Sequence, residues 1–252
     1  MIEIRKISKK FNQSLVLDEL SLNVETGQTC VIIGRSGCGK SVLLKHIIGL
    51  LAPDSGKVLV QGKNVGGLKE LELVALRAEI SMVFQGGALF DSMDVGENVG
   101  FSLLEHSNLS RKEIFARVEE SLHLVGLGGI GNLMPSELSG GMKKRVALAR
   151  AICIKPKIIL YDEPTTGIDP ITADAINELI RSLHDKLKVT SLVVTHDMKS
   201  ACSIADKIAM MYKGRILLEG SPQQIQETTD PVVHQFINGI SKGPITEAVG
   251  YL

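Results

Sequence analysis

The segment from Gly34 to Ser41 has the residue types and spacing of a phosphate-binding loop. It reads Gly34-Arg35-Ser36-Gly37-Cys38-Gly39-Lys40-Ser41 and fits the pattern G-x-x-x-x-G-K-[ST]. An apolar run, Gln28 to Ile33, predicts a buried strand before it, and Gly39 to Leu50 has helical spacing. Glycines let backbone N–H groups turn toward phosphate oxygens, and a helix N-terminus favours the same charge. The alternative is a glycine-rich turn that matches by chance.

Three side chains of this loop have predicted roles. Lys40 is expected to reach the β- and γ-phosphates of a nucleoside triphosphate, and Ser41 to ligate Mg²⁺. Cys38 lies in surroundings that favour a reactive thiol, so we expect its alkylation to abolish nucleotide binding. The other three cysteines form no Cys-x-x-Cys pair and are interpreted as small apolar residues of a reduced protein.

Two acids follow a second apolar run. Lys157 to Tyr161 predicts a strand, and Asp162 and Glu163 come directly after it. The C-terminal edge of a parallel sheet is where ligands bind, so Asp162 suits a Mg²⁺ ligand. Glu163 suits a general base that acts on an attacking water. A solvated acidic loop is the alternative.

Ser139, Gly140 and Gly141 stand at the predicted start of a long amphipathic helix. Ser139 is expected to be its N-cap. Free N–H groups at this end form a second anion-binding position, separate from the phosphate loop. One nucleotide site does not need two such ends in one chain, whereas a head-to-tail dimer brings each helix end to the partner's γ-phosphate.

The elements around these motifs predict an α/β fold with a mostly parallel sheet core. Ile2 to Val24 has the alternation of an antiparallel hairpin, with a polar interruption at residues 12–14. Residues 95–151 are mostly helical and predict a second lobe. The remaining expected strands are residues 57–60, 80–84, 158–161, 191–195, 207–211 and 215–219, and the remaining expected helices are residues 171–187, 222–226 and 231–238.

Composition sets limits on partners and location. The 252 residues suit one large domain with two lobes. Lys plus Arg and Asp plus Glu both total 28, so no net field favours nucleic acid. Apolar runs are far shorter than the roughly 18 to 20 residues of a membrane-spanning helix. Met1 to Arg5 reads into a strand and lacks a secretory signal, so we expect a cytoplasmic chain.

The motifs and their order resemble those of ABC-transporter ATPases, over essentially the whole chain. The order is an aromatic residue at Phe11, the phosphate loop, Gln85, Leu138 to Met142, Asp162-Glu163, Gly167-Ile168-Asp169 and His196. The chain departs from the usual family residues at Met142, Ile168 and Phe11, which stand where glutamine, leucine and tyrosine are common. None of these changes removes a phosphate contact.

This resemblance implies a P-loop NTPase fold, with an antiparallel N-terminal β lobe and a helical signature lobe, and a Mg²⁺-dependent ATPase. It implies that Phe11 stacks on adenine, that Gln85 senses Mg²⁺ and the attacking water while facing a membrane partner, and that His196 contacts the γ-phosphate. Asp169 then links two sites across a dimer. Phe11 as hairpin packing, and Gln85 and His196 as ordinary loop residues, are the alternatives.

The resulting site comprises three sets of residues. The catalytic set is Glu163, His196 and Gln85, and the metal set is Ser41, Gln85 and Asp162. The ATP-binding set is Phe11, Gly34, Arg35, Ser36, Gly37, Cys38, Gly39, Lys40, Ser41, Val42, Ser139, Gly140, Gly141 and Asp169.

Local features resemble one branch of the family, the Mla/Mce-type ATPases that power phospholipid movement between membranes. They are Met142, the segment from Gly87 to Met93, and the ending from Asp230 to Ile245, whereas Gly86 and Asp94 differ from this branch. The resemblance implies an ATPase domain over residues 1–240, with a helical lobe at about 86–155. It also implies a tail, residues 241–252, that clasps the neighbouring subunit.

The implied partners are a second copy of the chain, an integral-membrane permease, a STAS-type regulatory subunit and an Mce-domain lipid-binding subunit. The implied location is the inner face of the inner membrane. A small-solute importer ATPase, for amino acids for example, is the alternative within transporters. A non-transport ABC ATPase is the alternative outside them, but about 120 residues without sustained heptads separate the phosphate loop from Asp162, and basic clusters are lacking.

Overall fold

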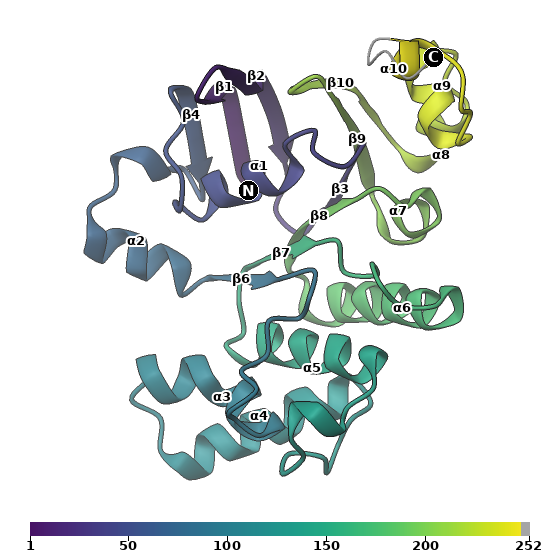
Figure 1. The fold of residues 1–252 in the computed structure, drawn as a ribbon. Coiled ribbons are helices and arrows are strands. Elements are labelled where there is room, and N and C mark those ends of the chain that lie inside the picture. Colours follow the sequence, from purple (N-terminus) through teal and green to yellow (C-terminus); the bar gives the residue numbers. More distant parts are fainter. Residues whose placement is uncertain (248–252) are drawn as a thin grey trace. The chain divides into compact units, whose positions relative to one another are not determined.

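The computed structural model describes residues 1–247, and these form two compact units. The first unit contains Met1–Leu68 and the chain from Leu192 onward. The second unit contains Lys69–Ser191. The chain therefore leaves the first unit once and returns to it (Figure 1).

An antiparallel sheet begins the first unit. Its strands are β1 (Ile2–Phe11), β2 (Ser14–Val24), β4 (Ser55–Val60) and β5 (Lys63–Asn64), in the order β2-β1-β4-β5. The short 3-10 helix η1 (Val65–Gly67) follows β5. Asn12 occupies the hairpin turn with a φ of 54°, a left-handed conformation that asparagine tolerates. The predicted hairpin over Ile2 to Val24 is thus confirmed.

A second group of strands in the first unit carries the phosphate loop. The strands β3 (Thr29–Ile33), β8 (Thr190–Thr195), β9 (Lys207–Tyr212) and β10 (Arg215–Gly220) follow the order β10-β9-β3-β8. The first two residues of β8 belong to the second unit. β3 pairs with β9 in parallel, and β9 pairs with β10 antiparallel. Every residue of β3 is buried, as its continuous apolar run predicts.

Two helices belong with these strands. The helix α1 (Lys40–Ile47) follows the phosphate loop, and α7 (Met198–Ile204) packs on β3. α1 ends before the predicted Leu50, because Gly49 takes a left-handed φ of 68° that breaks the helix. α7 was not predicted from the sequence. It is short, and its start is set by the Asp197 carboxylate, which accepts the N–H groups of Lys199 and Ser200.

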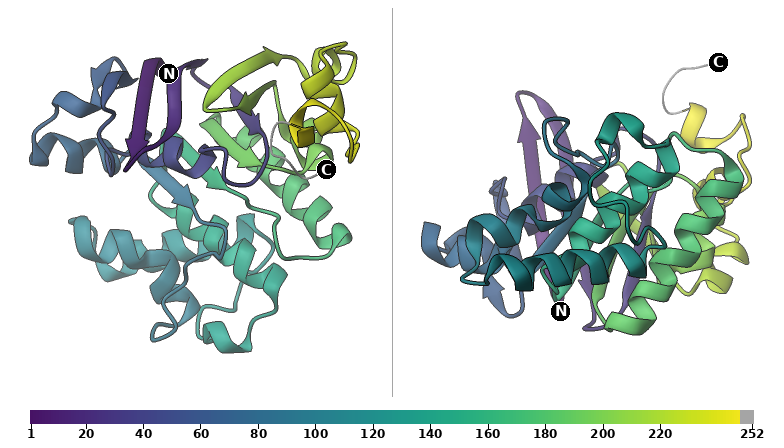
Figure 2. Two further views of the ribbon diagram at one scale, coloured as in Figure 1. Left: turned by 45° about the horizontal axis from the view of Figure 1, so that its top comes forward. Right: turned by 90° about the horizontal axis from the view of Figure 1, so that it is seen from below.

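Three short helices end the described part of the first unit. They are α8 (Pro222–Gln226), α9 (Pro231–Ile237) and α10 (Pro244–Glu247), coloured yellow in Figure 2. The buried Gln235 of α9 holds α10, since its Oε1 accepts from the Ile245 N–H at 2.8 Å and its Nε2 donates to the Ile240 carbonyl at 3.0 Å. Of the predicted tail at 241–252, the part at 248–252 lies outside the described residues, so the clasp stays a prediction.

The second unit joins a parallel strand pair to a group of helices. The strands β6 (Ile80–Val83) and β7 (Ile158–Asp162) pair in parallel. The helices α3 (Val95–His106), α4 (Arg111–Leu124) and α5 (Gly140–Cys153) pack on one another, as Figure 1 shows. The unit also contains α2 (Glu70–Arg77), the 3-10 helix η2 (Pro135–Glu137) and α6 (Pro170–Leu187).

None of the helices within residues 1–247 combines the length and the apolar character that a membrane span requires.

Gly56 occupies a position where only glycine fits, and this leads to a stability prediction. Its φ is +83°, and an added Cβ would lie 2.3 Å from the Lys6 carbonyl oxygen, beside the register shift that separates Arg5 from Ser8. We expect Gly56→Ala to lower the free energy of unfolding by about 1–3 kcal/mol. Urea unfolding measures this change. Gly62→Ala is the matched control, because Gly62 has a φ of +78° but nothing within 4 Å of its added Cβ. An equal loss in both variants would contradict the proposed clash.

Candidate nucleotide-binding and catalytic site

The phosphate loop connects β3 to α1 and depends on two closely packed glycines. An added Cβ on Gly34 would lie 2.5 Å from the Met211 carbonyl oxygen of β9. One on Gly39, whose φ is +108°, would lie 3.0 Å from the Leu17 side chain and 3.1 Å from the Val16 carbonyl oxygen of β2. The loop is therefore held between β2 and β9 in a shape that larger residues do not permit.

Lys40 supplies the positive charge of this loop. Its side chain is buried, and its ammonium donates to the Gly34 carbonyl at 2.7 Å and to the Arg35 carbonyl at 3.1 Å. The first turn of α1 holds no acidic residue, so nothing there offsets the positive end of the helix dipole. A buried ammonium, a helix N-terminus and a glycine-rich backbone together fit a bound polyphosphate.

Cys38 offers a chemical test of the loop. Its sulfur lies 3.0 Å from the position of an added Cβ on Gly34, so an adduct on the thiol fills the turn. We expect maleimide labelling of Cys38 to abolish ATP binding, and ATP to slow the labelling. Cys202→Ser confines labelling to Cys38, because Cys30 and Cys153 are buried. Unchanged ATP affinity after stoichiometric labelling would contradict the prediction.

Phe11 and His196 are the other site residues of the first unit. Phe11 pairs with Ser14 across the hairpin, and Ser14 lies two residues before Val16, which contacts Gly39. The Phe11 side chain is 41% exposed. The Lys9 ammonium lies 5.8 Å from its ring centroid. His196 is exposed and directly follows β8, the neighbour of β3 in the strand order. An exposed ring suits stacking on a base, so this role of Phe11 stays a prediction, with packing within the hairpin as the alternative.

Asp162 and Glu163 lie where β7 ends, in the second unit. Asp162 is the last residue of the strand and is partly buried. Glu163 is only 9% exposed, and its φ of 50° is a left-handed conformation that costs free energy for a non-glycine residue. The Thr166 hydroxyl donates to its Oε2 at 3.1 Å. The carboxylate is thus fixed in direction, as a general base requires.

Gln85 follows β6 in the same unit. Its side chain is exposed, whereas its backbone carbonyl accepts a hydrogen bond from the buried Lys144 ammonium of α5. Lys144 also interacts electrostatically with Glu163. The structure therefore brings Gln85 and Glu163 together around one lysine.

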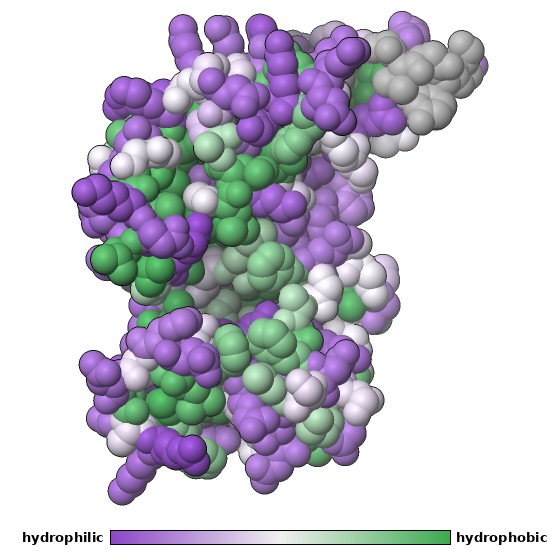
Figure 3. Space-filling model, turned by 60° about the vertical axis from the view of Figure 1, so that its left-hand side comes forward, coloured by the Kyte–Doolittle hydropathy of each residue, from purple (hydrophilic) through white to green (hydrophobic). Residues whose placement is uncertain are grey.

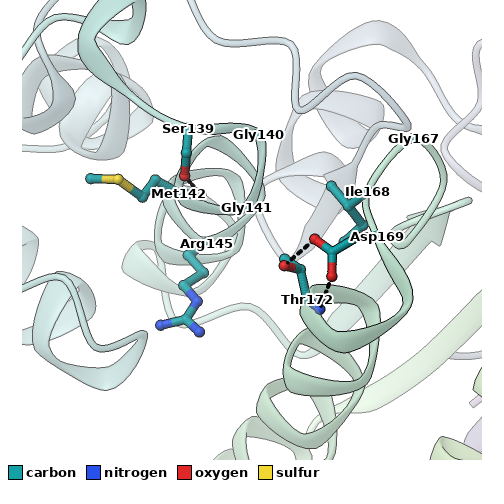
Figure 4. Close-up of a pocket in the computed structure, with 9 residues that line it drawn as sticks. All are labelled: Ser139, Gly140, Gly141, Met142, Arg145, Gly167, Ile168, Asp169 and Thr172. Carbon is teal, nitrogen blue, oxygen red and sulfur yellow. Dashed lines mark hydrogen bonds between the residues drawn. The ribbon is translucent and has the colours of Figure 1, made fainter.

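A pocket of about 470 Å³ lies between the start of α5 and the start of α6 (Figure 4). Ser139 caps α5 as predicted, accepting from the Met142 N–H at 3.2 Å. Asp169 caps α6, and its Oδ2 accepts the Thr172 hydroxyl at 2.6 Å. Hydrogen bonds from the Thr172 side chain and backbone lower the pKa of the Asp169 carboxyl, so this group is anionic at neutral pH.

Two glycines at the start of α5, Gly140 and Gly141, line this pocket. An added Cβ on Gly141 would lie 2.7 Å from the Thr172 side chain, and one on Gly140 would lie 3.7 Å from that of Ile168. The exposed backbone start of α5 and the Arg145 side chain line the pocket. A helix N-terminus and a guanidinium are donors that suit an anionic ligand.

Three residues that hold the site residues in place were not indicated by the sequence motifs. They are Lys144, Thr166 and Thr172. Lys144 stands among polar residues of the predicted helix, Lys143-Lys144-Arg145, so its type gives no sign that it is buried. Its spacing does, because Lys144 lies four residues before the apolar Leu148 and so shares its helix face. Thr166 and Thr172 lie three residues after Glu163 and Asp169, the spacing of local side-chain capping bonds.

Comparison with known proteins identifies the family. The model of the family described as ABC transporter matches residues 17–166. The chain belongs to the ABC transporter family, and its predicted class, the ATPase subunit, is confirmed.

Particular relatives and solved structures agree with this assignment. The intermembrane phospholipid transport system ATP-binding protein MlaF of Escherichia coli K12 is 42% identical over 97% of this chain and 91% of its own length. The chloroplastic protein TRIGALACTOSYLDIACYLGLYCEROL 3 of Arabidopsis thaliana is 44% identical over 97% of this chain and 75% of its own length. The probable ribonucleotide transport ATP-binding protein mkl of Mycobacterium tuberculosis H37Rv is 38% identical over 97% of this chain and 68% of its own. The resemblance to the Mla-type branch is thereby confirmed.

Solved cassettes confirm the predicted fold class. The dimeric ATP-binding cassette MJ0796, in a post-hydrolysis state with ADP and Pi, has a TM-score of 0.80 and 32% identity, covering 88% of this chain and 99% of that one. The cassette cbiO1 of Clostridium perfringens has a TM-score of 0.84 and 27% identity, covering 98% of both chains. The α/β P-loop architecture with an antiparallel β lobe and a helical lobe is therefore correct.

Proposed function

We propose that this chain hydrolyses ATP to power phospholipid transport through a separate integral-membrane permease. The observation that carries the proposal is the 42% identity to MlaF across 97% of the chain, because MlaF is named for intermembrane phospholipid transport. Transport also requires the chemistry of ATP hydrolysis, and the motifs described above supply it. Phospholipid contacts belong to the partner subunits, since the chain itself supplies the motor.

The proposed site is composite and needs two copies of the chain. The phosphate loop of one copy binds the triphosphate, and Ser139, Gly140 and Gly141 of the other bind its γ-phosphate, with Asp169 linking the sites. The open pocket at the start of α5 supports this arrangement, and the related cassette MJ0796 is dimeric. ATP binding favours the closed dimer by its differential affinity for that state, and hydrolysis releases it.

Each predicted residue has a part in this proposal. Glu163 accepts a proton from the attacking water, His196 contacts the γ-phosphate, and Phe11 stacks on adenine. Ser41, Gln85 and Asp162 are the residues that would hold Mg²⁺, and the ion would neutralise charge on the phosphates. Among residues 1–247, no group of three or more His, Cys, Asp and Glu side chains is placed to hold a metal ion. That finding fits Mg²⁺, which proteins usually bind through one or two carboxylates together with substrate phosphates and water.

The proposed membrane partner docks beside Gln85. Apolar side chains reach the surface of the second unit among charged ones, as the green patches in the lower part of Figure 3 illustrate. Phe84 and Phe90, which flank the Gln85 segment, are 41% and 42% exposed, and the Phe90 ring packs 4.8 Å from that of Phe101. Exposed aromatic residues of this kind are typical of contact surfaces.

The assembly follows from the same proposal. The permease holds two copies of the chain on the inner face of the inner membrane, and the proposed accessory partners are a STAS-type regulatory subunit and an Mce-domain lipid-binding subunit. Residues 1–240 form the ATPase domain and residues 241–252 the clasp. Deleting residues 241–252 is expected to weaken dimerisation, and unchanged dimerisation contradicts the clasp.

Reconstitution tests the proposed cargo. The chain is co-purified with its membrane partners, and transfer of labelled phospholipid between two vesicle populations is followed with ATP and with a non-hydrolysable analogue. We expect transfer only with ATP, and none with Glu163→Gln. Labelled amino acids and ribonucleotides are offered in parallel, the latter because one relative is named for ribonucleotide transport. ATP-driven uptake of either solute without phospholipid transfer would overturn the proposal.

A further inference from the structure

The buried Lys144 and the partly buried Arg150 of α5 hold the backbone of the segment that follows β6. The Lys144 ammonium donates to the Gln85 carbonyl. The Arg150 guanidinium donates to the Gly87 carbonyl at 2.6 Å and to the Ala88 carbonyl at 2.7 Å. Gly87 and Ala88 have φ values of 76° and 46°, so their carbonyls are turned out of any regular strand or helix. This part of the segment is therefore bound to α5 rather than free to move alone.

Asn98 of α3 holds the remainder of the segment. Its side chain is fully buried, and its Nδ2 donates to the carbonyls of Phe90 at 3.0 Å, Met93 at 3.0 Å and Asp94 at 2.9 Å. Its Oδ1 accepts from the Phe90 N–H at 2.8 Å. The backbone of residues 85–94 is thus held at both ends, so the Gln85 side chain extends from a backbone that α3 and α5 fix in place.

Lys144 has a second neighbour, which distinguishes it from Arg150. Its side chain is only 7% exposed, and a buried ammonium is costly unless it is paired. Burial lowers the pKa of Lys144, and the charge of Glu163 raises it. Lys144 thus connects α5, which begins at the Ser139 cap, with the Gln85 backbone and with the charge of Glu163, the residue after β7.

We propose that Lys144 is a positioning residue, which fixes the Gln85 backbone and the Glu163 carboxylate relative to α5 for ATP hydrolysis. The inference rests on the proposed function, because it requires that Gln85 and Glu163 act in hydrolysis. The Lys144 ammonium holds the Gln85 carbonyl and also interacts with the charge of Glu163, so a shift of α5 moves a cation on which both residues depend.

This role predicts a loss of turnover without a loss of ATP binding. Phosphate contacts do not involve Lys144, so Lys144→Met leaves the KM for ATP within about 2-fold and lowers kcat at least about 10-fold. Lys144→Arg keeps both the donor and the charge and is expected to recover kcat to within about 3-fold of the wild type. Lys143→Met is the matched control, since Lys143 is the adjacent lysine of α5 and is partly exposed.

The experiment measures steady-state and single-turnover ATP hydrolysis by the full chain, in whichever form, alone or with its permease, the wild type turns over. A double-mutant cycle with Glu163→Gln is included, because residues that act through each other give effects that do not multiply. We expect the double variant to hydrolyse ATP only slightly more slowly than Glu163→Gln alone. Lys144→Gln, which retains a donor for the Gln85 carbonyl, replaces the methionine variant if that variant does not fold.

The outcomes separate this inference from the proposed function. Native kcat in Lys144→Met, or effects of Lys144→Met and Glu163→Gln that multiply fully, would overturn the positioning role. A loss of kcat in Lys144→Met that is accompanied by a loss of thermal stability, and that Lys144→Arg does not recover, would also overturn it, because this result indicates a role in folding alone. If Glu163→Gln retains wild-type turnover, the catalytic assignment fails first, whatever Lys144 does.

Discussion

A Glu163→Gln variant is expected to bind ATP with near-native affinity and to hydrolyse it about 10²- to 10⁴-fold more slowly than the wild type. Glutamine keeps the shape of the side chain and can still accept the Thr166 hydroxyl, which lies 3.1 Å from the Glu163 Oε2. It cannot take a proton from water. Steady-state phosphate release measures the rate, and fluorescent-nucleotide titration measures the affinity.

Glu178→Gln is the matched control for this variant. Glu178 is an exposed carboxylate of α6 in the same unit, so its neutralisation is expected to leave the rate unchanged. Wild-type turnover in Glu163→Gln would contradict the role of Glu163 as the base. Loss of ATP affinity in that variant would instead show that the carboxylate supports binding.

The second large effect is expected from Lys40→Met, which should weaken ATP binding. Removing one partner of a buried, hydrogen-bonded charge pair costs about 2–5 kcal/mol, which is about 30- to 5,000-fold in Kd. The variant also loses the bonds from the Lys40 ammonium to the carbonyls of Gly34 and Arg35, which hold the loop in shape. Isothermal titration with Mg·ATP measures the change.

Lys45→Met serves as the control for the loss of positive charge. Lys45 belongs to the same helix, α1, but is exposed, so its loss is expected to change the Kd less than about 2-fold. Native ATP affinity in Lys40→Met would contradict the phosphate-loop assignment. A parallel loss of affinity in both variants would point to a general electrostatic effect rather than a specific contact.

Much of the fold was predictable because the strongest signals were local. The buried run at β3, the alternation of β1 and β2 and the helical period of α3 to α5 all reflect which side chains face the core. α2 and α7 were missed because they are short, with eight and seven residues, and because the apolar residues of α2 do not mark a face toward the core: Leu71 and Val74 are exposed and only Leu76 is buried. The early end of α1 depended on the backbone conformation of Gly49, which periodicity does not encode.

The candidate site was predictable where its chemistry is carried by motifs, and less so where it depends on contacts. Ser139 as the cap of α5 follows from its position before two glycines, and the structure confirms it. The bond from Lys144 to Gln85 could not be predicted, because it joins segments far apart in the chain. The strained φ of Glu163 could not be predicted either, because residue type does not encode it. The catalytic and metal-binding roles remain predictions, which the variants above are designed to test.

Light scattering of Glu163→Gln with and without Mg·ATP tests the composite-site motor most directly. Removing the base should trap the closed state, so the variant is expected to have the mass of one chain without nucleotide and twice that mass with Mg·ATP. Adding Ser139→Arg, which places a bulky cation at the start of α5, should abolish the dimer without weakening ATP binding to the phosphate loop. A nucleotide-bound variant that stays monomeric, both alone and when co-expressed with its membrane partners, would contradict the ATP-sandwich account.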